Sequence, residues 1–377
     1  MMITRRTYYL FSLLLLTAAC KQAYTPPVIS ANQAYLVVEG FINNGPDSTY
    51  ITVTHTFKLK DTASVTPELH ARLTVEGKDK SSYPLTEWGK GQYGVPSLIL
   101  NNTVQYRLHI KTAAGKEYLS DYVTLRSSPP IDSINWERTA GGVQIYSNTH
   151  DPQNATHYYR WDYMQVWEFH SYYYQQYQNL HDSFQIYSPN THYTCWAHAP
   201  NTNILINSTD KLTRDVVYKF PLTLIPVNSW LISVRYSINV KQYALSPEAY
   251  NFWQDMQRNS EQIGSIFSPQ PSSRSNGNVH AVSDSSEEVI GYISGGTLRQ
   301  QRIFITPFDV PDWRPGSYEV CEVADFPLDT ALLFTRDGGE VPVDSFRNDQ
   351  NKLRWNITVY SCTDCRVAGI TLKPPYW

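Results

Sequence analysis

The sequence lacks most of the features that mark membrane-spanning proteins and common enzymes. After residue 19, no apolar run approaches the roughly 20 residues that a transmembrane helix needs. No H-E-x-x-H or G-x-S-x-G pattern, phosphate-binding loop or dinucleotide fingerprint occurs. The net charge is −3 and there is no Lys/Arg run, so nothing predicts nucleic-acid binding. We therefore expect no metal, no cofactor and no catalytic activity.

The N-terminal segment is the most informative part of what is present. Two arginines precede an apolar core at 8–16, and small residues then lead to Cys20. This order is typical of a secretory signal peptide at 1–19, because the core is too short to span a bilayer. A cysteine directly after the small residues predicts lipoprotein processing, and ordinary signal cleavage is the alternative. We expect an acylated, palmitate-bearing Cys20, followed by a tether at 20–33.

Composition and patterning predict a mainly β fold. Aromatic residues make up 14% of the chain, and apolar and polar residues alternate in many short segments. Within 34–128, short strands separated by turn signals predict an immunoglobulin-like β-sandwich. The Ser-Ser-Pro-Pro sequence at 127–130 marks its end, and 129–377 is expected to form a larger antiparallel β-rich domain. A capping serine, a first-turn proline and an apolar stripe predict one short amphipathic helix at about 246–263.

The segment at 158–169 reads as a strand with two different faces. Alternation places Trp161 on one face, which we expect to lie in the core. The same alternation places Arg160, Asp162 and Met164 together on the other face.

The following stretch, at 170–192, is too polar for a core strand. It is predicted to form a hairpin tip or a loop, and loops carry function more often than cores do. Aromatic rings with polar tips suit contact with a sugar or a protein partner. The predicted partner or ligand surface consists of Tyr172, Tyr173, Tyr174, Tyr177 and His181.

Four cysteines follow the proposed lipidation site: Cys195, Cys321, Cys362 and Cys365. In an exported chain they favour structural disulfides, and they allow three complete pairings between which the sequence does not choose. The C-x-x-C motif either closes on itself or reaches one of the other two cysteines. A metal site and a redox pair are the alternatives, but the spacing forms no zinc knuckle and no βαβ context accompanies the motif.

Several short phrases occur in a characteristic order along the chain. They include LVVEG at 36–40, YYRW at 158–161, CTDCR at 362–366 and KPPYW at 373–377. As an ordered set they resemble the Bacteroidetes lipoproteins of domain-of-unknown-function family 4249. The resemblance implies an outer-membrane lipoprotein, often encoded beside a TonB-dependent receptor, and it implies no established activity or site residues. No acidic run follows Cys20, so both the periplasmic face and the cell surface stay open.

From these features we expect a lipid-anchored, non-catalytic binding or accessory protein that works with a TonB-dependent transporter in uptake. A structural or adhesive envelope lipoprotein is the first alternative. An enzyme acting on glycans or peptides is the second. A pocket that holds two carboxylates, or a metal at Cys362 and Cys365, would favour the enzyme.

Overall fold

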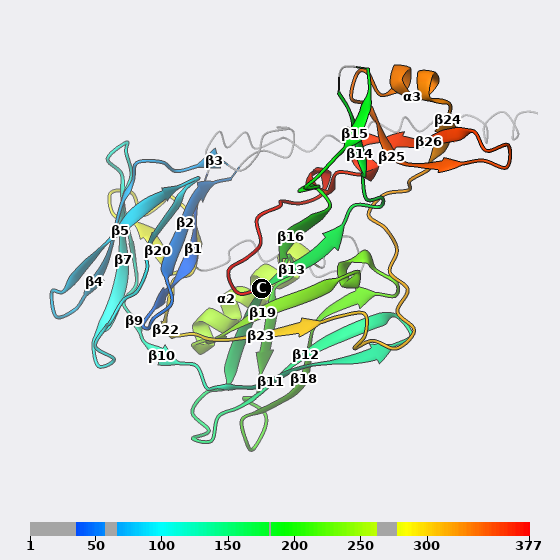
Figure 1. Ribbon diagram of the computed structural model, residues 1–377. Coiled ribbons are helices and arrows are strands. Elements are labelled where there is room, and N and C mark those ends of the chain that lie inside the picture. Colours follow the sequence, from blue (N-terminus) through cyan, green and yellow to red (C-terminus); the bar gives the residue numbers. More distant parts are fainter. Residues whose placement is uncertain (1–34, 57–65, 181, 262–276) are drawn as a thin grey trace, which may run out of the picture. The chain divides into compact units, whose positions relative to one another are not determined.

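The computed structural model describes residues 35–56, 66–180, 182–261 and 277–377 (Figure 1). Residues Tyr35–Trp377 form one compact unit. The predicted signal peptide, Cys20 and the tether lie outside the described residues. The described part is mainly β, as the composition predicts, and none of its helices is long and apolar enough to cross a membrane.

The first β-sandwich is built from thirteen strands. They are β1 (Leu36–Asn43), β2 (Thr49–His55), β3 (Thr66–Pro67), β4 (Arg72–Gly77), β5 (Ser82–Gly89), β6 (Gln92–Val95), β7 (Gln105–Lys111), β8 (Glu117–Ser120), β9 (Val123–Thr124), β10 (Arg126–Ser127), β20 (Val279–Ala281), β21 (Val289–Gly291) and β22 (Ser294–Thr297). The main strand order is β10-β22-β1-β2-β6-β5-β4-β7-β8-β20. Apolar residues from strands in both halves of this order pack into a single core. Ile51 of β2 and Leu108 of β7 are examples.

Three strands of this sandwich, β20, β21 and β22, come from the part of the chain that follows the domain boundary predicted at 128/129. Strands β21 and β22 pair in parallel with β1, and β20 pairs antiparallel with β8. Glu287, just before β21, accepts a hydrogen bond from the Tyr118 hydroxyl at 2.6 Å and forms an ion pair with Lys116 at 2.9 Å. Residues 279–297 therefore complete the first sandwich, a long-range pairing that leaves no local signal in the sequence.

The second sandwich packs two sheets against one core. Its strands are β11 (Ile131–Thr139), β12 (Gly142–His150), β13 (Tyr158–His170), β16 (Thr194–Pro200), β17 (Leu205–Ser208), β18 (Val216–Pro226), β19 (Arg235–Ala244) and β23 (Arg299–Ile305). One sheet has the order β11-β12-β18, and the other has the order β16-β13-β19-β23, with β17 also beside β13. Trp161 is fully buried between them and stacks on Phe220, so its predicted core position is confirmed.

The predicted helix is present as α2 (Pro247–Glu261). The Ser246 hydroxyl caps it by accepting from the Ala249 amide at 3.1 Å. Ala249 and Phe252 form its buried stripe against Tyr243 and its neighbours.

The C-terminal region adds a small sheet with the order β24-β26-β25. Its elements are β24 (Ala324–Phe326), α3 (Leu328–Phe334), β25 (Glu340–Arg347), β26 (Leu353–Val359) and the hairpin β14 (Tyr177–Asn179) and β15 (Phe184–Ile186). The hairpin lies in the stretch that the sequence predicts to be a hairpin tip or a loop. Trp355 anchors it, because its ring lies 4.9 Å from that of Tyr177 and 4.4 Å from that of Phe184.

Two disulfides stabilise this region. One attaches it to the second sandwich, and the other links two of its own segments. Cys195 of β16 is bonded to Cys365, and Cys321 is bonded to Cys362. The C-x-x-C motif therefore does not close on itself, and each of its cysteines reaches a different segment. Although Glu319 lies beside Cys321 and Cys362, those two sulfurs are bonded to each other and are not free to ligate a metal. The predicted structural disulfides are confirmed.

A buried amide ties the linker between the sandwiches to the second sandwich. Gln242 of β19 is fully buried, and its Oε1 accepts from the Trp161 indole at 3.0 Å. Its Nε2 donates to the Pro129 carbonyl at 2.9 Å and to the Thr149 hydroxyl at 3.1 Å. The Ser128 hydroxyl donates to the Gln242 carbonyl at 3.1 Å. The proline-bearing linker is thus packed into the junction and is not an extended spacer.

Replacing Gln242 with alanine is expected to lower the free energy of unfolding by roughly 2–4 kcal/mol. The substitution leaves the Trp161 indole and the linker carbonyl buried without partners, and each such group costs about 1–3 kcal/mol. Urea denaturation followed by tryptophan fluorescence measures the change. Gln300→Ala, at an exposed position of β23, is the matched control; a Gln242→Ala loss no larger than that of the control would contradict this role.

Candidate functional site

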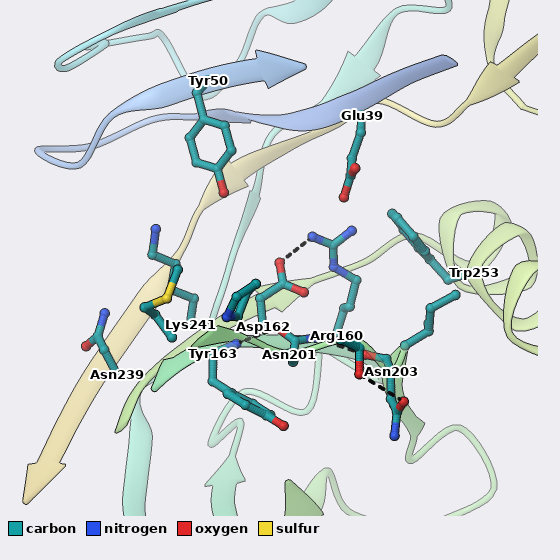
Figure 2. Close-up of a pocket in the computed structure, with 14 residues that line it drawn as sticks. Glu39, Tyr50, Arg160, Asp162, Tyr163, Asn201, Asn203, Asn239, Lys241 and Trp253 are labelled. Carbon is teal, nitrogen blue, oxygen red and sulfur yellow. Dashed lines mark hydrogen bonds and ion pairs between the residues drawn. The ribbon is translucent and has the colours of Figure 1, made fainter. Parts of the chain in front are cut away.

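The main candidate site is a pocket of about 280 Å³ between strands of the two sandwiches (Figure 2). Strands β1 and β2 supply one side, β13 and β19 supply the opposite side, and α2 and the segment after β16 supply the ends. Its lining residues are Glu39, Tyr50, Arg160, Asp162, Tyr163, Met164, Pro200, Asn201, Thr202, Asn203, Ile204, Asn239, Lys241 and Trp253.

The alternation of β13 builds one wall of this pocket. Trp161 points into the core of the second sandwich, so Arg160 and Asp162 point away from it. In the register with β19, Arg160 lies opposite Tyr243 and Asp162 lies opposite Lys241. The predicted shared face of Arg160 and Asp162 is therefore the face that lines the pocket.

Arg160 is held rigidly although it is charged and mostly buried. The carbon at the centre of its guanidinium lies 4.8 Å from the ring centre of Tyr243 and 4.3 Å from that of Trp253. Its Nη2 donates to the Asp162 carboxylate at 2.6 Å. Burial is the largest single effect and by itself lowers the pKa of Arg160, but the charge and hydrogen bond of Asp162, together with Tyr243 and Glu39, leave the pKa above its ordinary value. The guanidinium is thus fixed and cationic.

One polar atom of this arrangement is left without a partner. Among the residues that the structure describes, no acceptor lies within hydrogen-bonding distance of the buried Nε of Arg160. A second cavity of about 40 Å³ has Arg160, Asp162 and Phe41 among its lining residues. Buried polar groups are almost always hydrogen-bonded, so this donor indicates a place for an acceptor.

The first sandwich contributes one acid and one hydroxyl. Glu39 of β1 points toward the Arg160 guanidinium, and the Tyr50 hydroxyl of β2 points into the pocket (Figure 2). Although 41% of Tyr50 is exposed, burial near its hydroxyl raises the pKa of that group, and the negative charge of Asp162 adds to the shift. The hydroxyl therefore stays protonated and able to donate at neutral pH.

Amide side chains form another part of the wall. Asn201 accepts from the Tyr163 amide at 2.9 Å and donates to the Asn203 carbonyl at 2.9 Å, which fixes the turn after β16. Asn239 donates to Gln300 at 3.0 Å. Amides offer both donors and acceptors, and the two cations and two carboxylates of the lining balance in charge. The pocket therefore suits a neutral ligand that carries many hydroxyl or carbonyl groups.

The surface predicted from the aromatic stretch is only partly exposed. Tyr172 and Tyr174 are 49% and 48% exposed, whereas Tyr173 and Tyr177 are half-buried, and Tyr177 packs on Trp355. His181 lies outside the described residues. None of the four described tyrosines lines the main pocket.

The pocket itself was not predicted, because its two sides come from segments far apart in the sequence. The available signal was local. Charged Arg160 and Asp162 alternate with aromatic residues inside a strand whose other face is apolar. Such charges in the middle of a core strand need partners. Glu39, Tyr50 and Trp253 carry no comparable signal.

The comparisons with known proteins give a family and little else. A family model described as a domain of unknown function, DUF4249, matches residues 21–302. No curated protein matches the chain. Among solved structures, a two-fibronectin-type-III-domain segment from chicken tenascin matches at 13% identity, with 56% of this chain and 93% of that chain covered and a TM-score of 0.16. With so low a TM-score, that similarity carries no argument.

Replacing Asp162 with asparagine is expected to destabilise the fold by about 1–3 kcal/mol. The change removes the charge that compensates the buried guanidinium of Arg160. Urea denaturation measures it, with Asp325→Asn as the control, because the Asp325–Arg354 pair is an exposed ion pair worth less than about 1 kcal/mol. Equal losses of unfolding free energy in the two variants would show that the Arg160–Asp162 pair contributes no more to stability than an exposed ion pair.

Proposed function

The chain belongs to the DUF4249 family, defined by a domain of unknown function, and from this premise we propose that it is a lipid-anchored, non-catalytic binding protein. Its pocket captures a small, hydroxyl-rich ligand of the saccharide class. The protein then acts as an accessory to a TonB-dependent transporter at the outer membrane.

The observation that carries the proposal is the buried and prebuilt guanidinium of Arg160. Two aromatic rings and one carboxylate hold it in place, so little conformational entropy is lost when a ligand binds. Fixed polar groups of this kind around a concave site are typical of small-molecule binding sites.

The balance of charges narrows the class of ligand. Arg160 and Lys241 offset Glu39 and Asp162, so a strongly charged ligand such as a phosphate would meet as much repulsion as attraction. A sugar hydroxyl can both donate to a carboxylate and accept from a guanidinium or an amide. The same lining groups can therefore satisfy several neighbouring hydroxyls at once.

The lipid anchor and the transporter partnership are parts of the proposal that are supported mainly by the sequence. An acylated Cys20 would hold the protein at the outer membrane, on its periplasmic or outer face. The rings of Tyr172 and Tyr174 are exposed and available to contact a partner, and the Tyr173 amide between them donates to the Cys362 carbonyl. Exposed aromatic residues are enriched at protein interfaces.

A glycoside hydrolase is the second candidate, because the pocket does hold two carboxylates, Glu39 and Asp162. Asp162 forms an ion pair with Arg160, an arrangement that fits a base or a nucleophile better than a general acid. Glu39 would then have to be the acid.

The pocket is tested with glycosides. We expect at least one methyl β-glycoside of glucose, galactose or N-acetylglucosamine to bind the full chain carrying Cys20→Ala, purified without detergent. Tyr50→Phe removes a donor in the pocket and is expected to weaken that binding about tenfold. Isothermal titration measures the affinity, and Tyr218→Phe, at a 76% exposed position of β18, is the control.

The same titrations separate the two candidates. Mass spectrometry of the recovered glycosides should find them intact if the protein only binds them. Cleaved glycoside, absent with Asp162→Asn, would favour the hydrolase. No binding and no cleavage for any of the three sugars would refute both.

The membrane part is tested by affinity purification from intact membranes, with partners identified by mass spectrometry. The unmodified chain is expected to retain a TonB-dependent transporter. Combined Tyr172→Ala, Tyr173→Ala and Tyr174→Ala should lower transporter recovery several-fold and leave the chain in the membrane, whereas Tyr218→Ala should change nothing. Cys20→Ala should move the chain to the soluble fraction. Unchanged transporter recovery with the triple variant would contradict the proposed contact surface. Membrane retention of the Cys20→Ala variant would contradict the proposed lipid anchor.

A further inference from the structure

We infer that the ligand is amphipathic, with a polar head in the main pocket and an apolar arm that lies in a second groove on the outer face of β13. This inference rests on the proposed function and specifies its ligand. Met164 carries it, because this side chain lines both the polar pocket and the apolar groove.

The continuity follows from strand geometry. Asp162, Met164 and Val166 alternate along β13 with residues of its core-facing side and share the outer face of the strand. In the register with β16, Met164 lies opposite Pro200 and Val166 lies opposite His198. Asp162 and Val166 are four residue steps apart along the strand, which is about 13 Å. Met164 is therefore the side chain that lies between the pocket and the groove. The lining is charged on the Asp162 side of Met164 and apolar on the Val166 side.

The groove has a volume of about 220 Å³, and one of its walls is the C-terminal tail. This wall is held in place. Backbone hydrogen bonds of 2.8 and 2.9 Å join Ile370 to Trp196 of β16. Further along, the ring of Tyr376 lies 3.6 Å from the Arg302 guanidinium, and the Trp377 indole donates to Glu168 at 2.6 Å. The groove is thus present before any ligand binds.

Its apolar residues are left open to solvent. Leu372 is 75% exposed, Ile370 is 51% exposed and Met164 is 39% exposed. Among the described residues, the lining of the groove includes no carboxylate, lysine or arginine, and its titratable side chains are His198 and Tyr376. A hydrocarbon arm would cover these side chains, and each buried methylene adds to the affinity. A second sugar would find few hydrogen-bonding partners there.

The inference is tested with pairs of methyl and hexyl β-glycosides of the same three sugars, titrated into the full chain carrying Cys20→Ala at glycoside concentrations below micelle formation. The hexyl compound of a bound sugar is expected to bind at least about tenfold more tightly than its methyl partner. Leu372→Ser should remove most of that gain without changing the methyl affinity. Leu212→Ser, at a 54% exposed position away from both sites, should retain it.

The outcomes separate this inference from the proposed function. Equal affinities for hexyl and methyl compounds, or a gain that survives Leu372→Ser, would overturn the apolar arm and leave the saccharide pocket standing. Hexyl binding that depends on Leu372 but is insensitive to Tyr50→Phe, with no methyl binding at all, would support the groove and refute the saccharide pocket. No binding of either series would overturn both.

Discussion

The two-residue period of β13 is the constraint on which the site depends. Because successive side chains of this long strand point in opposite directions, the rings that fill the core of the second sandwich force their neighbours onto the outer face. Trp161 is fully buried, and so Arg160 and Asp162 must face outward. A slip of one residue in the register would bury the ion pair in the core and expose the indole, so the core that stabilises the strand also fixes the site.

The charge of Arg160 is tolerated at this mostly buried position because neighbouring groups compensate for its desolvation. The guanidinium of Arg160 lies between Tyr243 and Trp253, and its only protein acceptor among the described residues is Asp162. Desolvation of an unpaired guanidinium would be prohibitive, and the carboxylate together with the two ring faces offsets most of that penalty. The junction at Gln242 then fixes the linker between the sandwiches against the second sandwich, which carries Arg160.

Local patterns in the sequence predicted what is local in the structure. Alternation assigned Trp161 to the core and Arg160 to the opposite face, and capping residues located α2 to within a few residues. The parts that could not be predicted all depend on long-range partners. Strands β20–β22 return to the first sandwich across more than half of the described chain, and each cysteine of the C-x-x-C motif bonds to a distant segment. Glu39 reaches the pocket only because β1 packs near β13, and nothing in its neighbourhood in the sequence marks it.

The two disulfides connect this architecture to the environment in which the protein is expected to work. The Cys195–Cys365 bond joins β16, which forms one side of the apolar groove, to the start of the tail that forms the other side. Only four residues lie between Cys365 and Ile370, whose backbone pairs with Trp196, so the bond fixes where the tail begins to follow the strand. Disulfides of this kind persist in oxidising compartments and are rare in the cytosol. Such bonds are compatible with the export that the N-terminal segment predicts.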